Sequence, residues 1–195
     1  MQAAPLKLII LDRDGVINHD SDAFIKSPAE WIAIDGALSA IARLNQAGYK
    51  VVVATNQSGV GRGFFTMQTL NAIHQKMHLA AQAVGAEIDA VFFCPHMADE
   101  NCDCRKPKPG MLQAIGKRFN VRLKDVPVVG DSLRDLQAGY VVGCAPYLVL
   151  TGKGTDTRER AGLPPGTRIF SDLRAVVEHL LDQTSESHPN LPAAH

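Results

Sequence analysis

Residues 6–16 read LKLIILDRDGV, an apolar run that stops at two aspartates. A short apolar run without alternation is typical of a β-strand that is covered on both faces of its sheet. Similar short runs recur along the chain, at residues 50–54, 90–93, 127–129 and 147–150. We therefore predict a buried strand at each of these runs.

Segments with the apolar spacing of a helix lie between these runs, at residues 37–47, 67–84, 111–119 and 133–142. Strands that alternate with helices form a parallel sheet with helices on both faces, joined by right-handed crossovers. The sequence therefore predicts an α/β fold built on a Rossmann-like parallel sheet. Thr66 is suited to cap the second of these helices, and Gly48 and Gly85 are suited to helix ends.

The chain has 195 residues, 46% of them hydrophobic, and is long enough to bury one core. We expect one domain over residues 5–183 and a disordered tail over residues 184–195, where apolar periodicity is lost. The formal net charge of zero does not favour a nucleic-acid partner. The apolar run near the N-terminus fits neither a signal peptide nor a membrane span, so we expect a cytoplasmic protein without a membrane partner.

Polar residues follow the predicted strands where each one ends. Asp12 and Asp14 follow the first strand, Thr55 the second and Asp131 the fourth, and Lys106 lies between the third and fourth. In an open α/β sheet the carboxyl ends of neighbouring strands meet at one edge, so these side chains are expected to converge. Carboxylates suit Mg²⁺, while a lysine and backbone amides offset the charge that would otherwise repel a phosphate.

The same residues lie in four segments that match, in order, the motifs of a known superfamily. The segments are DRDGV at 12–16, VVVATNQ at 51–57, CRKPKPG at 104–110 and VVGDSLRD at 128–135. With these four motifs the sequence resembles the haloacid dehalogenase superfamily of phosphatases. The resemblance covers residues 6–152 and implies the haloacid dehalogenase fold.

The resemblance also implies a mechanism. Asp12 would attack phosphorus to form an aspartyl phosphate, and Asp14 would protonate the leaving alcohol and then activate water. Thr55 and Lys106 would hold the oxygens of the transferred phosphoryl group. A catalytic Mg²⁺ would be bound by Asp12, Asp131 and a backbone carbonyl near Asp14, with Asp135 in contact through water.

A second cluster of potential ligands lies just before Lys106. Cys94, His96, Cys102 and Cys104 form a C-x-H…C-x-C pattern in one short loop. Four soft or borderline ligands are what tetrahedral Zn²⁺ requires, and with no position left open for water such a zinc is structural. We therefore predict a structural zinc site that fixes the loop leading to Arg105 and Lys106.

The zinc pattern narrows the resemblance to two families. The D-glycero-D-manno-heptose 1,7-bisphosphate phosphatases share it, as do the histidinol-phosphate phosphatases. The stretches TNQSGVGRG at 55–63, GDSLRDLQAG at 130–139 and LTGKG at 150–154 favour the heptose family, whereas the short loop between His96 and Cys102 suits the histidinol family at least as well. The favoured expectation is hydrolysis of the 7-phosphate of the heptose bisphosphate, a step in lipopolysaccharide assembly.

Other functions stay open at this point. Histidinol-phosphate phosphatase is the main alternative, followed by a polynucleotide 3'-phosphatase and a sugar-phosphate sensor without catalysis. By the resemblance, the side chains that contact the substrate are Arg13, Asp20, Asn56, Gln57, Ser58 and Arg105.

The segments between the motifs are too short for a separate cap domain, so we expect an open site and a monomer. We interpret the glycine-rich residues 59–63 as a flexible specificity loop. His74 and His78 are expected on a solvated helix face.

Overall fold

The computed structural model describes residues 6–186. Six parallel strands form one sheet in the order β3-β2-β1-β4-β5-β6. The strands are β1 (Lys7–Leu11), β2 (Tyr49–Asn56), β3 (Ala90–Cys94), β4 (Pro127–Gly130), β5 (Ala145–Val149) and β6 (Arg168–Phe170). The predicted α/β fold is confirmed, and the five predicted strands end within about two residues of their predicted bounds.

β6 was missed in the sequence because it is short and partly exposed. Its three residues read RIF, and neither Arg168 nor Ile169 is buried. A strand at the edge of a sheet needs no long apolar run, since only one side of it is paired. The apolar pattern that predicts the central strands is therefore absent here.

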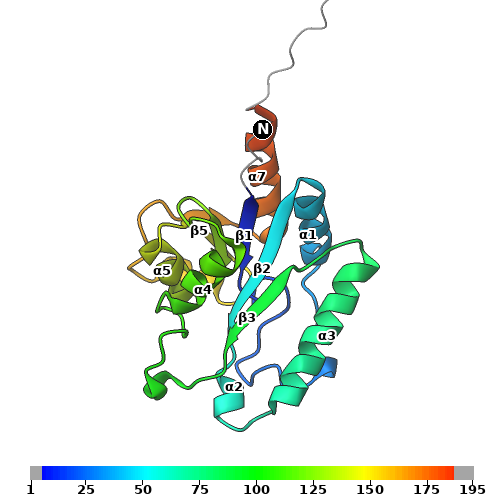
Figure 1. Ribbon diagram of the computed structural model, residues 1–195, viewed down its shortest axis with the longest axis vertical. Coiled ribbons are helices and arrows are strands. Elements are labelled where there is room, and N and C mark those ends of the chain that lie inside the picture. Colours follow the sequence, from blue (N-terminus) through cyan, green and yellow to red (C-terminus); the bar gives the residue numbers. More distant parts are fainter. Residues whose placement is uncertain (1–5, 187–195) are drawn as a thin grey trace, which may run out of the picture.

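Helices cover both faces of the sheet (Figure 1). The α-helices are α1 (Ala37–Gln46), α2 (Ser58–Gly61), α3 (Met67–Ala83), α4 (Gly110–Phe119), α5 (Leu133–Val141), α6 (Gly154–Glu159) and α7 (Leu173–Glu186), with short 3₁₀ helices η1 (Pro28–Glu30) and η2 (Ala98–Glu100). As predicted, the Thr66 hydroxyl caps α3 by accepting from Thr69 N at 3.1 Å. Gly48 and Gly85 adopt positive φ angles just beyond the helix ends.

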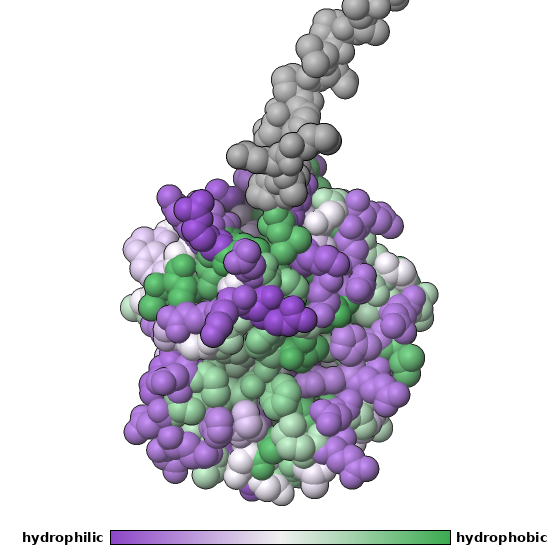
Figure 2. Space-filling model, in the orientation of Figure 1, coloured by the Kyte–Doolittle hydropathy of each residue, from purple (hydrophilic) through white to green (hydrophobic). Residues whose placement is uncertain are grey.

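The side chains of β1 alternate between the two faces of the sheet, and the core has one layer on each face. Ile9 and Leu11 face α1, α3 and α7, whereas Leu8 and Ile10 face α4 and α5. Successive side chains of a strand point to opposite faces, so one continuous apolar run serves both layers. On the face shown in Figure 2, hydrophobic residues reach the surface between hydrophilic ones, and the half-buried edge strand β3 crosses this face.

Three further sequence expectations concern single segments. The glycine-rich residues 59–63, expected as a flexible loop, contain most of helix α2. α7 includes residues 184–186 of the expected tail, and the remainder of that tail lies outside the described residues. Among residues 6–186, no helix is both long and apolar enough to cross a membrane.

The contact between α5 and β4 depends on a glycine. A Cβ atom on Gly139 would lie 2.3 Å from Val128 Cγ1, so the helix can approach the strand only because this residue has no side chain. Alanine would favour the helix by about 1 kcal/mol, but overpacking a buried contact costs about 1–3 kcal/mol. The packing effect is expected to dominate.

We predict that Gly139→Ala lowers the free energy of unfolding by about 1–2 kcal/mol in urea denaturation. Val141→Ala, at an exposed position of the same helix, should stay within about 0.5 kcal/mol of the wild type. A more stable Gly139→Ala variant would show that helix propensity outweighs packing at this contact.

Candidate active site

The strand order brings the motif residues to one edge of the sheet. β1 lies between β2 and β4, and Leu11 is level with Val53 on one side and Val129 on the other. Asp12 and Asp131 directly follow β1 and β4, and Thr55 is the last residue but one of β2, so all three lie at the carboxyl ends of these strands. The convergence expected from the sequence is therefore what the sheet produces.

Three buried carboxylates meet at this edge. Asp12, Asp131 and Asp135 each place a carboxylate oxygen within 4.8 Å of the other two. Burial, together with the neighbouring Asp135, raises the pKa of Asp12 to about 6 and that of Asp131 to about 8. Buried like charges repel each other, and oxygen-rich sites of this kind suit Mg²⁺.

A close backbone approach holds Asp131 in place. A Cβ atom on Gly15 or on Gly152 would lie 2.0 or 2.2 Å from Asp131 Oδ2, and both glycines have positive φ angles. The Lys153 backbone N–H donates to the same oxygen at 2.8 Å. No role was predicted for Gly15 or Gly152, although they lie within the segments DRDGV and LTGKG.

Lys106 is buried between two of the three carboxylates. Its Nζ lies 3.1 Å from Asp12 Oδ1 and 2.7 Å from Asp135 Oδ1, and it donates to the Ala54 carbonyl at 2.6 Å. Burial opposes the charge of the ammonium, but Asp12 and Asp135 raise its pKa overall. Lys106 is thus a fixed cation beside the Asp12 carboxylate.

Asp135 has both oxygens engaged within the protein. Oδ1 pairs with Lys106, and Oδ2 accepts from Ser132 N at 3.1 Å and from Ser132 Oγ at 2.5 Å in a capping box at the start of α5. Burial alone would raise the pKa of Asp135, yet Lys106 and Arg134 lower it overall. Among the three carboxylates, Asp12 and Asp131 are therefore better placed to bind a cation.

The Asp14 carboxylate points away from this cluster. It accepts from Arg13 Nε at 3.1 Å and Arg13 Nη2 at 2.9 Å, from Asn18 Nδ2 at 2.9 Å and from Gln57 Nε2 at 2.8 Å. Burial opposes the charge, but Arg13 and these hydrogen bonds lower the pKa of Asp14. The side chain of Asp14 is therefore not in position to join the expected metal ligands, which leaves only its backbone carbonyl for that role.

Two residues expected to bind substrate, Arg13 and Gln57, support Asp14. The Arg13 side chain has no exposed surface and does not line the cavity described below, a position that does not fit direct substrate binding. Gln57 is buried and bridges Asp14 and the Thr55 hydroxyl. His74, expected on a solvated face, is buried against Arg13, with 3.3 Å between Nε2 and Nη1. Its spacing from Leu70 and Met77 places it on the apolar face of α3, which is the local signal for its burial.

A cavity of about 250 Å³ opens above the carboxylates. It exposes Asp12, Asp14, Thr55 and Asp131, together with five residues expected at the substrate: Asp20, Asn56, Gln57, Ser58 and Arg105. Asn56 also holds the Lys106 backbone by two hydrogen bonds, of 3.0 and 3.1 Å. The remaining lining residues are Ser21, Asp22, Phe24, Ile25, Arg62, Arg134 and Lys153.

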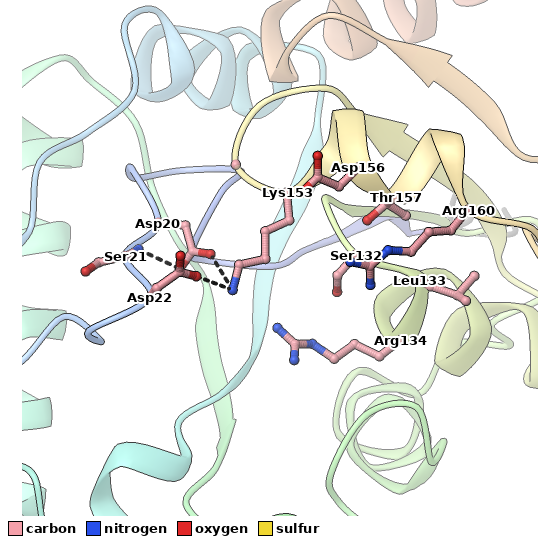
Figure 3. A pocket seen from close by; sticks show the side chains of 11 residues that line it. Asp20, Ser21, Asp22, Ser132, Leu133, Arg134, Lys153, Asp156, Thr157 and Arg160 are labelled. Carbon is pink, nitrogen blue, oxygen red and sulfur yellow. Dashed lines mark hydrogen bonds and ion pairs between the residues drawn. The ribbon is translucent and has the colours of Figure 1, made fainter.

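A larger pocket of about 690 Å³ continues from this cavity (Figure 3). Lys153 Nζ extends across it and pairs with Asp20 Oδ2 at 3.3 Å and Asp22 Oδ1 at 3.1 Å. Arg134 reaches in from α5, and Arg160 lies beyond α6. Charged groups of both signs thus line this side of the site.

The predicted zinc ligands converge. Cys94 Sγ lies 3.6 Å from His96 Nδ1 and 3.5 Å from Cys102 Sγ, and Cys104 Sγ lies 3.3 and 3.5 Å from the same two atoms. A tetrahedron with bonds of ~2.0–2.3 Å to zinc has edges of about 3.3–3.8 Å. All four cysteines of the chain are free thiols, so the cluster could hold Zn²⁺.

The zinc loop is joined to the active site by backbone contacts. Gln57 N donates to the Cys94 carbonyl at 2.7 Å, and Gly61 N donates to the Pro95 carbonyl at 3.0 Å. Arg105 Nη1 donates to the His96 carbonyl at 3.2 Å, so the backbone of a zinc ligand orients a cavity arginine. Zinc binding can therefore affect the cavity without taking part in chemistry.

The raised pKa values predict how stability depends on pH when no divalent cation is present. Asp12 and Asp131 hold protons more tightly when folded than at their ordinary value of 3.8. At low pH both carboxyl groups are protonated, which favours the folded state. This contribution to the free energy of unfolding is lost as the pH rises through about 6 for Asp12 and about 8 for Asp131. With a chelator, we expect the unfolding free energy to fall over this range, and added Mg²⁺ to raise the melting temperature more at pH 8 than at pH 6.

Asp131→Asn should remove most of this pH dependence and most of the Mg²⁺ effect, as followed by thermal melts over pH. Asp35→Asn, an exposed aspartate elsewhere, serves as the control for the loss of one charge. A Mg²⁺ effect that survives in Asp131→Asn would place the cation elsewhere.

The zinc cluster gives a second prediction. Cys102→Ser should lower the bound zinc, measured by mass spectrometry, and speed up hydrogen exchange in residues 94–104 while β1 and β4 stay protected. Because Arg105 is held by the His96 carbonyl, we expect a ~10-fold lower kcat/KM with unchanged Mg²⁺ dependence. Cys144→Ala, which removes a thiol outside the cluster, should keep the zinc; full activity without zinc would contradict the coupling.

Two comparisons with family models match the chain. A model described as HAD-hydrolase-like matches residues 103–176, and a model described as polynucleotide kinase 3 phosphatase matches residues 7–138. Both matches cover motif segments whose side chains meet in the cavity. The second model spans more than half of the chain.

Characterised relatives match nearly full length. The D-glycero-β-D-manno-heptose-1,7-bisphosphate 7-phosphatase of Bordetella bronchiseptica is 61% identical over 91% of this chain and 99% of its own. The enzyme of that name from Neisseria meningitidis is 52% identical over 92% and 97%. A crystal structure of the Bordetella enzyme, complexed with magnesium and phosphate, superposes with a TM-score of 0.90 at 61% identity, covering 91% of this chain and 99% of that one. The chain thus belongs to the heptose-1,7-bisphosphate 7-phosphatase family of the haloacid dehalogenase-like hydrolases.

Proposed function

We propose that this protein hydrolyses the 7-phosphate of D-glycero-β-D-manno-heptose 1,7-bisphosphate. The observation that carries the proposal is a pair of carboxylates, two residues apart, held in opposite environments at one cavity. Asp12 lies beside Lys106 in the carboxylate cluster, whereas Asp14 is held by Arg13 outside that cluster. The cation beside Asp12 favours the ionised form that a nucleophile needs, and Asp14 is left to exchange protons. The names of the full-length relatives supply the substrate.

In the first step Asp12 attacks phosphorus and the bond to the sugar oxygen breaks. Lys106 keeps the Asp12 carboxylate in place and stabilises the charge that develops on the phosphoryl oxygens, with the Thr55 hydroxyl nearby. Mg²⁺ held by Asp12 and Asp131 would supply further compensation of charge between carboxylate and phosphate. The products of this step are the aspartyl phosphate and the sugar alcohol.

Asp14 moves the protons in both steps. Its lowered pKa means that it is ionised in the free enzyme, so it must take up a proton before it can donate one. An anionic phosphate bound nearby favours that uptake by raising the pKa of the carboxyl group. Asp14 then protonates the leaving sugar oxygen, and as a base it takes the proton of the water that cleaves the aspartyl phosphate.

The arginines of the cavity suit a substrate with a second phosphate. Arg62, Arg105 and Arg134 all line the cavity. A second phosphate would be attracted to these guanidinium groups, a contact that histidinol phosphate, with one phosphate, does not make. The comparisons lend no support to the histidinol alternative, and the polynucleotide-phosphatase model matches only the catalytic core of a chain without net charge.

We also propose the domain organisation, oligomeric state and cellular location of the enzyme. A single phosphatase domain over residues 5–183, a monomer and a cytoplasmic location are consistent with a cavity formed by one chain and with free thiols at a metal cluster. Size-exclusion chromatography with light scattering measures the oligomeric state directly.

Turnover of the two candidate substrates tests the function. With Mg²⁺ present and Asp12→Asn as the blank, we expect kcat/KM for the heptose bisphosphate to exceed that for histidinol phosphate by ~100-fold, about 2.7 kcal/mol in the transition state. The reverse preference would overturn the substrate assignment.

Arg105→Gln should lower kcat/KM for the bisphosphate by ~10-fold or more, because a charged phosphate contact is lost. It should change kcat/KM for the heptose 7-phosphate by less than ~3-fold, since that substrate lacks the second phosphate. Arg122→Gln, an exposed arginine outside the cavity, is the matched control.

A further inference from the structure

The helix α3 contributes a buried histidine to the charged groups behind the site. His74 is only 8% exposed, although residues on both sides of it along α3, such as Asn71 and Gln75, are exposed. Its Nε2 atom lies 3.3 Å from Arg13 Nη1, and its ring lies 5.9 Å from the ring of Phe93 on β3. The histidine therefore faces inward, against the back of the Arg13 guanidinium.

Arg13 has few partners available to it. The side chain is completely buried, and its Nε and Nη2 atoms both donate to the Asp14 carboxylate. The remaining guanidinium nitrogen, Nη1, does not contact Asp14, and its hydrogen-bond partner is His74. A buried N–H donor without a partner costs about 1–3 kcal/mol, so the contact with His74 fixes which way the guanidinium faces.

His74 can accept this hydrogen bond because it is neutral. Burial, followed by the positive charge of Arg13 and by His78, lowers the pKa of His74 to about 4, while Asp14 acts in the opposite direction. A neutral imidazole with its proton on Nδ1 leaves the Nε2 lone pair free to accept from Arg13. The geometry and the charge state thus agree on the direction of the hydrogen bond.

We propose that His74 is a positioning residue that holds Arg13 and, through Arg13, the Asp14 carboxylate. The inference rests on the proposed function, in which Asp14 protonates the leaving sugar oxygen. Asp14 has partners on three sides: Arg13, Asn18 and Gln57. Arg13 is the only cation among them, and its own orientation depends on His74. A small displacement of an acid-base group is enough to slow proton transfer.

The test compares two leaving groups. A sugar alcohol needs protonation as it leaves, whereas p-nitrophenolate leaves readily without an acid. His74→Leu removes the acceptor, and we expect kcat/KM for the heptose bisphosphate to fall ~10-fold while that for p-nitrophenyl phosphate changes by less than ~2-fold. Because kcat/KM covers only the steps up to loss of the leaving group, later hydrolysis of the aspartyl phosphate does not enter the comparison.

His74→Gln keeps an oxygen that can accept from Arg13, so it should retain activity on the bisphosphate within ~3-fold of the wild type. His78→Leu, one turn further along α3, is the matched control and should leave both substrates unaffected. Thermal melts check that each variant is folded, and His74→Met carries the same test if His74→Leu does not fold.

Equal losses on both substrates, or no loss in any variant, would overturn the role of His74. The proposed function fails separately. If the wild-type enzyme does not hydrolyse the heptose bisphosphate but hydrolyses another alkyl phosphate, the substrate assignment is wrong, and the comparison of leaving groups is made with that ester.

Discussion

The buried ammonium of Lys106 is the interaction on which the site depends. It lies between Asp12 and Asp135 and also donates to the Ala54 carbonyl, so one cation connects residues that follow β1, belong to α5 and lie on β2. Buried carboxylates this close together would repel each other strongly without a cation among them. Asn56 holds the Lys106 backbone from the neighbouring strand. The position of the Asp12 carboxylate is thereby set by charge pairing as well as by the end of β1.

A second pairing of charges, separate from the first, sets the environment of Asp14. Arg13 pairs with Asp14 and contacts His74 on α3, whereas Lys106 pairs with Asp12 and with Asp135 on α5. Asp12 and Asp14, two carboxylates of one short motif, therefore lie beside different cations. In the proposed mechanism this separation lets Asp12 attack while Asp14 transfers protons.

The zinc loop, residues 94–104, orients other segments of the site through its backbone carbonyls. It is joined to the end of β2 and to α2 through the carbonyls of Cys94 and Pro95, and to Arg105 through the carbonyl of His96. Within residues 6–186, every named strand belongs to the one sheet, and loop residues such as Asp20, Asp22 and Arg105 line the cavity. Selectivity must then come from loops, and a metal cluster is an effective way to hold a loop rigid at low cost in chain length.

The sequence by itself determined the parallel α/β sheet, the motif residues at its carboxyl edge and the Cys/His cluster that could hold zinc. Those features follow from apolar runs and from spacings within a few residues, which local physical chemistry governs. Only the tertiary structure decided that Arg13 and Gln57 support Asp14 and that His74 lies behind them. His74 and Arg13 are 61 positions apart, and Gln57 and Asp14 are 43 apart. Contacts over such distances depend on how α3 and β2 pack beside β1, which no local pattern encodes.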